Sequence, residues 1–318
     1  MYDNVTFWVS RYDVGDEVFE GLRFFMRDGK DVGYMGNVRI EYVKDFRQLT
    51  SPPYSAKCSG SIPKWFDGSN VTAPTFAEVC HQINEVCKML HISSTQARVT
   101  GLEFGSSYQM TQPPARYNDL LWAYPKSIRN THNKYKDVQT VSFQSQAKKP
   151  TFCYTFYDKG AEVLKKDGVK LDGYTLRYEI RYLRKLKQQL KWSGEGVITL
   201  QTLQDPQFYT LLIGNYTATF ERITKLVEMN GNYKIKTAGD GANRFFSQLA
   251  NEQLRQDHNA LKRFTDDVKM HNPNLSRSEL SRMRSKIRNI LNSSSKSDSM
   301  IGELDRQIRA ECARCSPP

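Results

Sequence analysis

TFCYTFYDKGAEV at residues 151–163 and GYTLRYEIRYLRKL at residues 173–186 are the two segments that decide the fold. Each segment alternates as a strand does, with successive side chains on opposite faces. One face of each strand is aromatic or aliphatic and is predicted to be buried. The other face is polar, and it carries Thr155, Tyr157 and Lys159 in the first strand and Arg177, Glu179 and Arg181 in the second. An ordinary amphipathic sheet with a solvated charged side would alternate in the same way, so these strands alone leave the function open.

Alternating segments elsewhere predict three more strands, at residues 2–10, 37–43 and 97–110. Residues 75–90 instead place apolar side chains at helical spacing, and Thr75 with Glu78 matches a capping box. The segment SGSIPKWFDGSN at residues 59–70 is rich in Gly, Ser and Asn and predicts a turn and loop. Long alternating segments with few helices between them favour an α+β fold on an antiparallel sheet, with helix 75–90 on its apolar face.

The second half of the chain has a different composition. Residues 111–150 are polar and predict a loop with a short hairpin, whereas residues 199–230 contain helical patches. From about residue 242 the chain consists almost entirely of helix-forming residues. A length of 318 residues fits one large domain or two. We predict a sheet domain at residues 1–198 and a helical, basic region at residues 199–318.

The charge balance points to a polyanionic partner. The chain has 46 Lys and Arg against 34 Asp and Glu, a net charge of +12. Nucleic acid is favoured over a membrane surface because no long basic segment has a strong apolar face. No apolar run approaches the roughly 20 residues that span a bilayer. The N-terminus has early acidic residues and lacks the basic start of a secretory signal, so a soluble cytoplasmic protein is expected.

Several common sites are not predicted. The pair Cys312 and Cys315 has no second pair and no nearby histidine, so free thiols are expected there instead of a zinc site. The sequence has no GxxxxGK[ST] and no GxSxG motif, which argues against a P-loop ATPase and a serine hydrolase. The five histidines include no His-x-His pair, so a histidine-ligated metal is not supported.

Three predicted strands each present one reactive polar face. These faces carry Glu103, then Tyr157 with Lys159, and then Glu179. If the strands lie close together in one sheet, two carboxylates and a tyrosine converge. Hard carboxylate oxygens suit Mg²⁺ or Mn²⁺. A tyrosine can attack phosphorus and form a covalent intermediate, while Lys159 would hold the phosphate or favour the phenolate.

Glycines flank one of these carboxylates. Gly101 and Gly105 lie two residues to either side of Glu103 on the same face, where they leave little side chain around it. A ligand or a neighbouring backbone can therefore come close. A bulge or an irregular strand edge would explain the same glycines.

Three motifs in order resemble a known family. They are RVTGLEF at residues 98–104, TFYDKGAE at 155–162 and LRYEIRYL at 176–183. Their order and spacing resemble the replication initiators of filamentous phages, the gene II and gene X family, and more distantly those of some rolling-circle plasmids. The segment SIPKWFDGSN, followed by a helix, also looks like that family's segment before its first motif. The likeness covers roughly residues 1–200.

The resemblance implies an origin-nicking endonuclease with a Rep-type nuclease domain. Tyr157 would be the nucleophile, leaving a 5′-phosphotyrosine link and a free 3′-hydroxyl primer, with Lys159 beside it. Glu103 and Glu179 would be metal or structural carboxylates for Mg²⁺ or Mn²⁺. Tyr154, on the opposite strand face, ranks second as nucleophile. The implied partners are single-stranded or supercoiled origin DNA and the helicase and polymerase of a host cell, in whose cytoplasm the protein would work.

Two basic runs, at residues 184–191 and 277–288, are predicted to contact phosphates, with a solvated helical face as the alternative. The predicted DNA contacts are Arg177, Arg181, Arg184, Lys185, Lys187, Arg282, Arg284, Lys286 and Arg288. Two other functions stay open. A mobilisation relaxase would use the same tyrosine chemistry, and a non-catalytic origin-binding regulator would keep only the scaffold. The intact Tyr157, Glu103 and Glu179 argue against the regulator.

Overall fold

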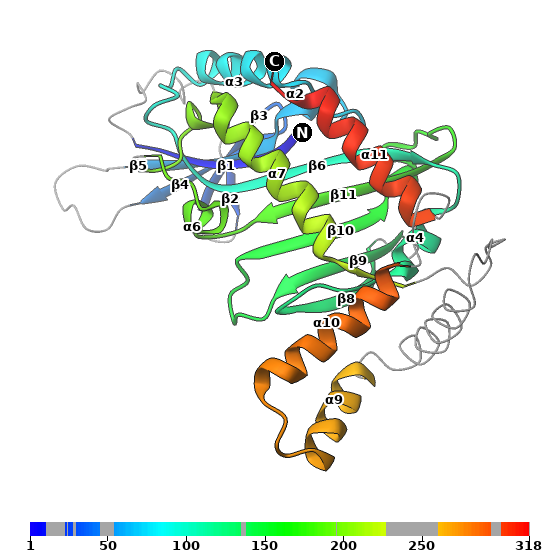
Figure 1. The fold of residues 1–318 in the computed structure, drawn as a ribbon. Helices are drawn as coiled ribbons and strands as arrows, with labels where there is room; N and C mark the ends of the chain where they lie inside the picture. The colour runs from blue at the N-terminus through cyan, green and yellow to red at the C-terminus, as the bar shows by residue number, and fades with distance from the viewer. Residues whose placement is uncertain are drawn as a thin grey trace.

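A computed structural model describes residues 1–10, 23, 25–27, 30–44, 54–134, 138–194, 196–226, 260–293 and 300–317. Its centre is a ten-stranded antiparallel sheet with the strand order β2-β3-β4-β5-β1-β6-β11-β10-β9-β8 (Figure 1). The predicted α+β fold class is confirmed. The strands of this sheet are β1 (Tyr2–Ser10), β2 (Phe25–Arg27), β3 (Lys30–Met35), β4 (Val38–Lys44), β5 (Tyr54–Ser61), β6 (Arg98–Met110), β8 (Ser127–Lys134), β9 (Val138–Ser145), β10 (Phe152–Asp158) and β11 (Tyr174–Tyr182).

A two-stranded sheet and the helices complete the fold. The small sheet pairs β7 (Leu121–Ala123) with β12 (Thr224–Lys225). The helices are α2 (Ile62–Asp67), α3 (Phe76–Met89), α4 (Pro114–Leu120), α5 (Lys159–Asp167), α6 (Leu186–Leu190), the 3-10 turn η2 (Thr202–Gln204), α7 (Pro206–Arg222), α9 (Ala260–His271), α10 (Arg277–Ser293) and α11 (Met300–Cys315). No helix in the described ranges is long and apolar enough to cross a membrane.

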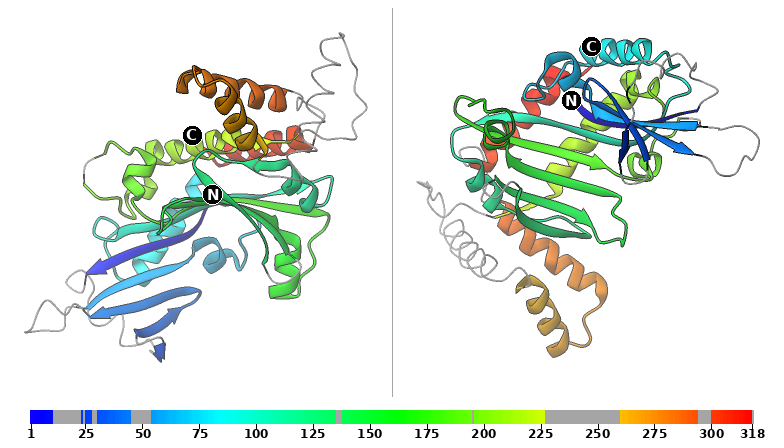
Figure 2. Two further views of the ribbon diagram at one scale, coloured as in Figure 1. Left: turned by 90° about the horizontal axis from the view of Figure 1, so that it is seen from below. Right: turned by 180° about the vertical axis from the view of Figure 1, so that it is seen from behind.

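Helices α7 and α11 lie across one face of the large sheet (Figures 1 and 2). The aromatic side chains of β10 and β11 pack against α7 there. Phe156 stacks on Tyr178 with ring centroids 4.3 Å apart, and Tyr178 stacks on Tyr216 of α7 at the same distance. The Tyr216 hydroxyl donates to the Tyr178 carbonyl at 2.8 Å. The predicted aromatic face is therefore the core face, and Arg177 and Glu179 point to the opposite side.

Helix α3 begins where the sequence predicts. The Thr75 side chain accepts from the Glu78 amide, and the Glu78 carboxylate accepts from the Thr75 amide at 2.7 Å, so the capping box is present. The apolar stripe Val79, Ile83 and Val86 is buried in the same core as the strands. Cap and periodicity together therefore fix both the start and the buried side of this helix.

The helical C-terminal region shares the core of the sheet. Helix α7 buries Phe208, Leu212 and Tyr216, and α11 buries Leu304 and Ile308, all in one cluster with the strands. Both helices lie beyond residue 198, the predicted domain boundary. We therefore propose that the sheet domain extends through α7 and α11. The predicted helices at residues 242–259 lie outside the described residues.

Three local predictions need correction. Residues 59–70 do not form only a turn and loop, because β5 runs to Ser61 and α2 follows. Ser61 caps this helix, and Gly68 ends it in the left-handed region at φ 67°. Residues 111–150 hold the predicted hairpin as β8 and β9, together with helix α4. Lys159 is not on strand β10, which ends at Asp158, but is the first residue of α5.

Candidate active site

Three carboxylates from three adjacent strands meet on the face of the sheet that points away from α7. Asp3 of β1, Glu103 of β6 and Glu179 of β11 each offer an oxygen within 4.8 Å of the others. Glu179 lies beside Gly105 in the β6–β11 pairing. A Cβ added to Gly105 would be 2.5 Å from the Tyr178 carbonyl oxygen and 2.7 Å from Glu179 Cα. Gly105 therefore lets the two carboxylate-bearing strands approach, as the flanking glycines indicated.

A bulge in β1 aims Asp3 at this cluster. Tyr2 pairs with Phe104 and Val5 with Leu102, so three steps along β1 match two along β6. Tyr2 and Val5 both stay on the core face as a result, at 2% and 1% exposure. The extra residue turns Asp3 onto the polar face, as bulges often do near functional sites. Simple alternation places Asp3 with Val5 on the core face, so no pattern in the sequence indicates Asp3 as a site residue.

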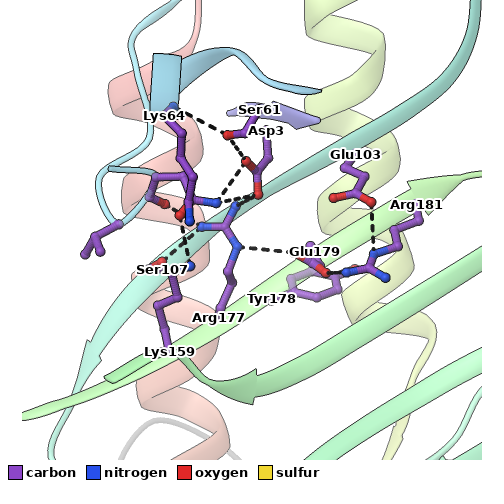
Figure 3. Close-up of polar contacts among 12 residues, drawn as sticks. Asp3, Ser61, Lys64, Glu103, Ser107, Lys159, Arg177, Tyr178, Glu179 and Arg181 are labelled. Carbon is purple, nitrogen blue, oxygen red and sulfur yellow. Dashed lines mark hydrogen bonds and ion pairs between the residues drawn. The ribbon is translucent and has the colours of Figure 1, made fainter. Parts of the chain in front are cut away.

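The buried side chain of Arg177 forms ion pairs with two of the carboxylates. Its guanidinium lies 2.6 Å from Asp3 Oδ2 and 3.2 Å from Glu179 Oε2, as Figure 3 shows. It also donates to the Asn70 carbonyl at 2.8 Å and to the Ser107 hydroxyl at 3.1 Å. Although burial opposes its charge, the attraction of Asp3 and Glu179 raises the pKa of Arg177. With 2% of its surface exposed, Arg177 positions carboxylates and does not fit the predicted contact with DNA.

Arg181 makes the second link, between Glu179 and Glu103 (Figure 3). Its Nε lies 3.3 Å from Glu103 Oε1, and its Nη2 pairs with Glu179. The Arg181 side chain keeps 29% of its surface exposed, so it closes the cluster on the solvent side. The cluster therefore contains three carboxylates and two guanidiniums, and negative and positive groups alternate along it.

The carboxyl of Glu103 has a raised pKa. A quarter of its side chain is still exposed. Desolvation of the carboxyl, followed by repulsion from Glu179, raises the pKa of Glu103 to about 7. Arg181 opposes this shift without cancelling it. Near neutral pH, Glu103 therefore exchanges a proton, and a cation bound there would displace it.

Tyr157 lies next to the cluster on the same face. Its hydroxyl donates to Glu179 Oε2 at 3.5 Å, and 4% of the residue is exposed. Burial, with the nearby charge of Glu179, raises the pKa of Tyr157 well above its usual value. The structure thus places Tyr157 beside Glu179, whereas Glu103 lies two strands away and pairs with Arg181. Tyr154 points to the core face, where its ring stacks on Phe152 with centroids 4.6 Å apart.

Lys159 reaches the site from the first turn of α5. Its ammonium donates to Glu162 at 2.7 Å and to the Asn70 side-chain oxygen at 2.9 Å, and 1% of the residue is exposed. Burial, and then the charge of Arg177, lower the pKa of Lys159. Although burial opposes it, hydrogen bonding and charge from Lys159 hold the pKa of Glu162 at about 2. Hydrogen bonds to Glu162 and Asn70 therefore hold Lys159 in the site.

Asn70 connects the parts of the site. Its side-chain amide donates to both oxygens of Asp3 at 2.9 Å, and its side-chain oxygen accepts from Lys159. Ser61, the cap of α2, donates to Asp3 at 2.7 Å. Both residues belong to SIPKWFDGSN, the segment singled out by family resemblance. Their contacts join sequence positions too distant for any spacing rule to reveal.

A groove of about 980 Å³ opens beside the cluster. It runs over β5, β1 and β6 to the start of α6, and Glu103 lines it. Its basic side chains are Lys57, Arg98, Arg184, Lys185 and Lys187. The half-buried Trp8 offers an aromatic surface in the same groove. The predicted basic run at 184–191 therefore contributes three basic residues to the groove, whereas Lys57, Arg98 and Trp8 were not predicted.

The second predicted basic run lies elsewhere, on α10. Arg282 and Lys286 are exposed and Arg284 is half-buried, while the side chain of Arg288 is outside the described residues. None of these residues lines the groove beside the carboxylates. Cys312 and Cys315 are buried in α11 as free thiols.

The cluster suits a hard divalent cation. Its ligand atoms are carboxylate oxygens, which Mg²⁺ and Mn²⁺ prefer, and they are close enough to share one ion. Asp3, Glu103 and Glu179 would hold it. In this structure the guanidiniums of Arg177 and Arg181 neutralise part of the carboxylate charge. A cation would therefore compete with Arg181 for Glu179 and with the proton on Glu103.

Comparison with known proteins shows a distant structural likeness. No family model and no curated protein matches the chain. Among solved structures, the chain is similar to the rolling circle replication initiator protein from Geobacillus stearothermophilus, with a TM-score of 0.37 and 11% sequence identity. The likeness covers 74% of this chain and 89% of the other.

Proposed function

We propose that this protein initiates rolling-circle replication by nicking origin DNA through Tyr157, with Mg²⁺ or Mn²⁺ at the carboxylate cluster. One observation carries the proposal. The Tyr157 hydroxyl donates to Glu179 at 3.5 Å, Glu179 converges with Asp3 and Glu103, and a basic groove opens at Glu103. The groove suits a strand of DNA, since basic side chains pair with phosphates and Trp8 offers a face for base stacking.

The proposed chemistry is a displacement at phosphorus. The Tyr157 oxygen forms a bond to the phosphorus, and the bond from phosphorus to the 3′ oxygen breaks. The phenol proton passes to Glu179, the carboxylate within reach of the hydroxyl, and the released 3′ oxygen takes a proton from water to become a hydroxyl primer. The 5′ end stays on the enzyme, so the phosphotyrosine bond keeps the energy for later rejoining.

The charged neighbours would act on the phosphate. Arg181 is partly exposed and pairs with two carboxylates, so an entering phosphate offers it an alternative anionic partner. Tyr157 is 4% exposed in this structure, so its hydroxyl would have to be uncovered before it attacks a phosphate. A divalent ion held by the three carboxylates would polarise a phosphate oxygen and offset developing charge.

The test uses the purified full chain, Mn²⁺ and single-stranded oligonucleotides from the replicon that encodes it. Tyr157→Phe is expected to abolish nicking and the covalent adduct while keeping DNA binding, since only one hydroxyl is lost. Tyr154→Phe is the matched control and should keep the adduct. Mass spectrometry of the trapped complex locates the nucleotide. A phosphonucleotide on Tyr154, cleavage without an adduct, or full activity of Tyr157→Phe would refute the proposal.

A further inference from the structure

Helix α10 presents a surface that the nicking site does not use. Its buried side consists of Leu280, at 7% exposure, with the half-buried Met283 and Ile287. Ile287 on this side packs against the core, and α10 contacts both β12 and α9. The opposite side faces solvent, and Figure 1 shows α10 and its partner α9 projecting below the sheet.

The exposed side of α10 has a symmetric pattern. At about 100° per residue, Ser278, Ser281 and Ser285 share a strip about 60° wide opposite the buried side. All three serines are exposed. Basic residues flank the strip on both sides, with Arg277 and Arg284 along one edge and Arg282 and Lys286 along the other. The centre of this surface is therefore small and polar, and both of its edges are positive.

These charges are not used within the described part of the molecule. Among the described residues, no carboxylate forms an ion pair with Arg277, Arg282, Arg284 or Lys286. The one acidic residue of the helix, Glu279, is occupied at the helix start. Its carboxylate accepts from the amide and the hydroxyl of Ser276, at 2.8 and 2.7 Å. Glu279 thus satisfies the first turn, and no described carboxylate compensates the positive edges of α10.

We propose that α10 binds double-stranded DNA by lying in the major groove. An α-helix about 10–12 Å across fits that groove, which is about 12 Å wide. A duplex has phosphates on both walls, matching basic residues on both edges of the serine strip. Small hydroxyl side chains at the centre let the helix approach the base edges and hydrogen-bond to them. A single strand has one backbone and would need only one basic edge.

This surface is separate from the nicking site. Helices α9 and α10 lie on the same side of the sheet as α7 and α11 (Figure 2), whereas the carboxylates point away from α7. The choice of DNA as the ligand rests on the proposed function. Within that function, α10 would hold duplex beside the origin while the groove near Glu103 holds the strand to be cut.

The experiment compares charge removal at the two edges in the full chain. One variant is Arg282→Gln/Lys286→Gln and the other is Arg277→Gln/Arg284→Gln. The control is Lys262→Gln/Lys269→Gln, which removes the same charge from exposed positions of α9. Fluorescence anisotropy measures binding to a mixed-sequence duplex of about 24 base pairs and to one of its strands alone, over a series of salt concentrations.

Each edge variant should weaken duplex binding about tenfold and lower its salt slope by about 0.9 per lost contact. Binding to the single strand should change less than about twofold, and the control should behave as the unaltered chain. Equal losses on duplex and single strand would overturn the proposal, as would an effect from one edge alone or effects no larger than the control's. Circular dichroism confirms that each variant is folded.

The same variants separate this inference from the nicking proposal. They should nick a single-stranded oligonucleotide at the normal rate, because the α10 residues lie outside the groove. Tyr157→Phe should in turn bind duplex normally. If Tyr157→Phe kept its nicking activity, the proposed chemistry would fail, yet the duplex measurements would still decide the role of α10.

Discussion

The carboxylate of Asp3 lies 2.6 Å from the guanidinium of Arg177, although 174 positions separate the two residues in the chain. Both side chains are almost completely buried. The pair fixes β1 to β11 across β6, and it places Asp3 beside Glu179. A single buried contact thus connects the start of the chain to the strand that carries the predicted carboxylate.

Removing Asp3 should therefore destabilise the fold. We expect Asp3→Ala to lower the free energy of unfolding by about 3 kcal/mol, because it leaves a buried guanidinium with less opposing charge. Urea denaturation followed by circular dichroism measures this. The control is Asp305→Ala, which breaks a solvent-exposed ion pair with Arg309 and should cost less than about 1 kcal/mol. Equal losses in the two variants would contradict this account of the pair.

Divalent-ion binding should depend on the protonation of Glu103, whose pKa is raised to about 7. Affinity for Mn²⁺ should rise roughly tenfold per pH unit below about pH 7 and then level off, since the ion displaces the proton. Titration calorimetry at several pH values tests this. Glu103→Gln should bind weakly with little pH dependence. A flat profile for the unaltered chain would show that Glu103 is not a ligand.

The raised pKa of Glu103 also predicts how the free energy of unfolding changes with pH. The pKa of Glu103 is higher in the folded chain than its ordinary value of 4.5, so the folded state holds this proton more tightly. Its contribution to stability should therefore fall as pH rises from about 4.5 to about 7 without metal. Urea unfolding of the unaltered chain and of Glu103→Gln across that range would show the difference. Identical pH profiles for the two proteins would contradict it.

Close strand packing at Gly105 gives another prediction. A methyl group there would meet backbone atoms of Tyr178 and Glu179 within 2.5–2.7 Å, so β6 and β11 would have to separate. We expect Gly105→Ala to cost about 1–3 kcal/mol of stability and to weaken divalent-ion binding. The control Gly214→Ala adds a methyl group to α7 where no atom lies within 4 Å, and should stabilise the chain slightly. A tolerated Gly105→Ala would refute the steric argument.

The groove should bind a single strand through its charges. Arg184→Gln/Lys187→Gln should lower the salt slope of single-strand binding by about 0.7 per lost phosphate contact. Lys262→Gln/Lys269→Gln again removes equal charge outside the groove and should leave the slope unchanged. Anisotropy with a labelled oligonucleotide provides the measurement. An unchanged slope in the groove variant would assign residues 184–191 to solubility.

The strands of the site follow from local alternation in the sequence. Residues 151–158 and 174–182 alternate along their length, and the structure makes each one a strand with the predicted aromatic face inward. In residues 97–110 a register shift against β1 interrupts the alternation, so Val99 is buried in the core with Leu102 although alternation places it with Glu103. Glu103, Tyr157 and Glu179 share the opposite face for the same reason. Alternation does not reveal that these polar side chains are buried, because it predicts a solvated polar face. Tyr157, Arg177 and Glu179 are nearly inaccessible, since each is covered by partners from distant segments.

The sequence by itself determined the α+β class, the start of α3, and which strand face carries the reactive groups. These features depend on periods and caps only a few residues long. Only the tertiary structure decided that Asp3 completes the carboxylate cluster, that Asn70 connects it to Lys159, and that a groove opens at Glu103. A bulge reverses the facing of every residue beyond it, and its position depends on how β1 pairs with a strand about a hundred residues away. Contacts of that range leave no periodic trace in the sequence.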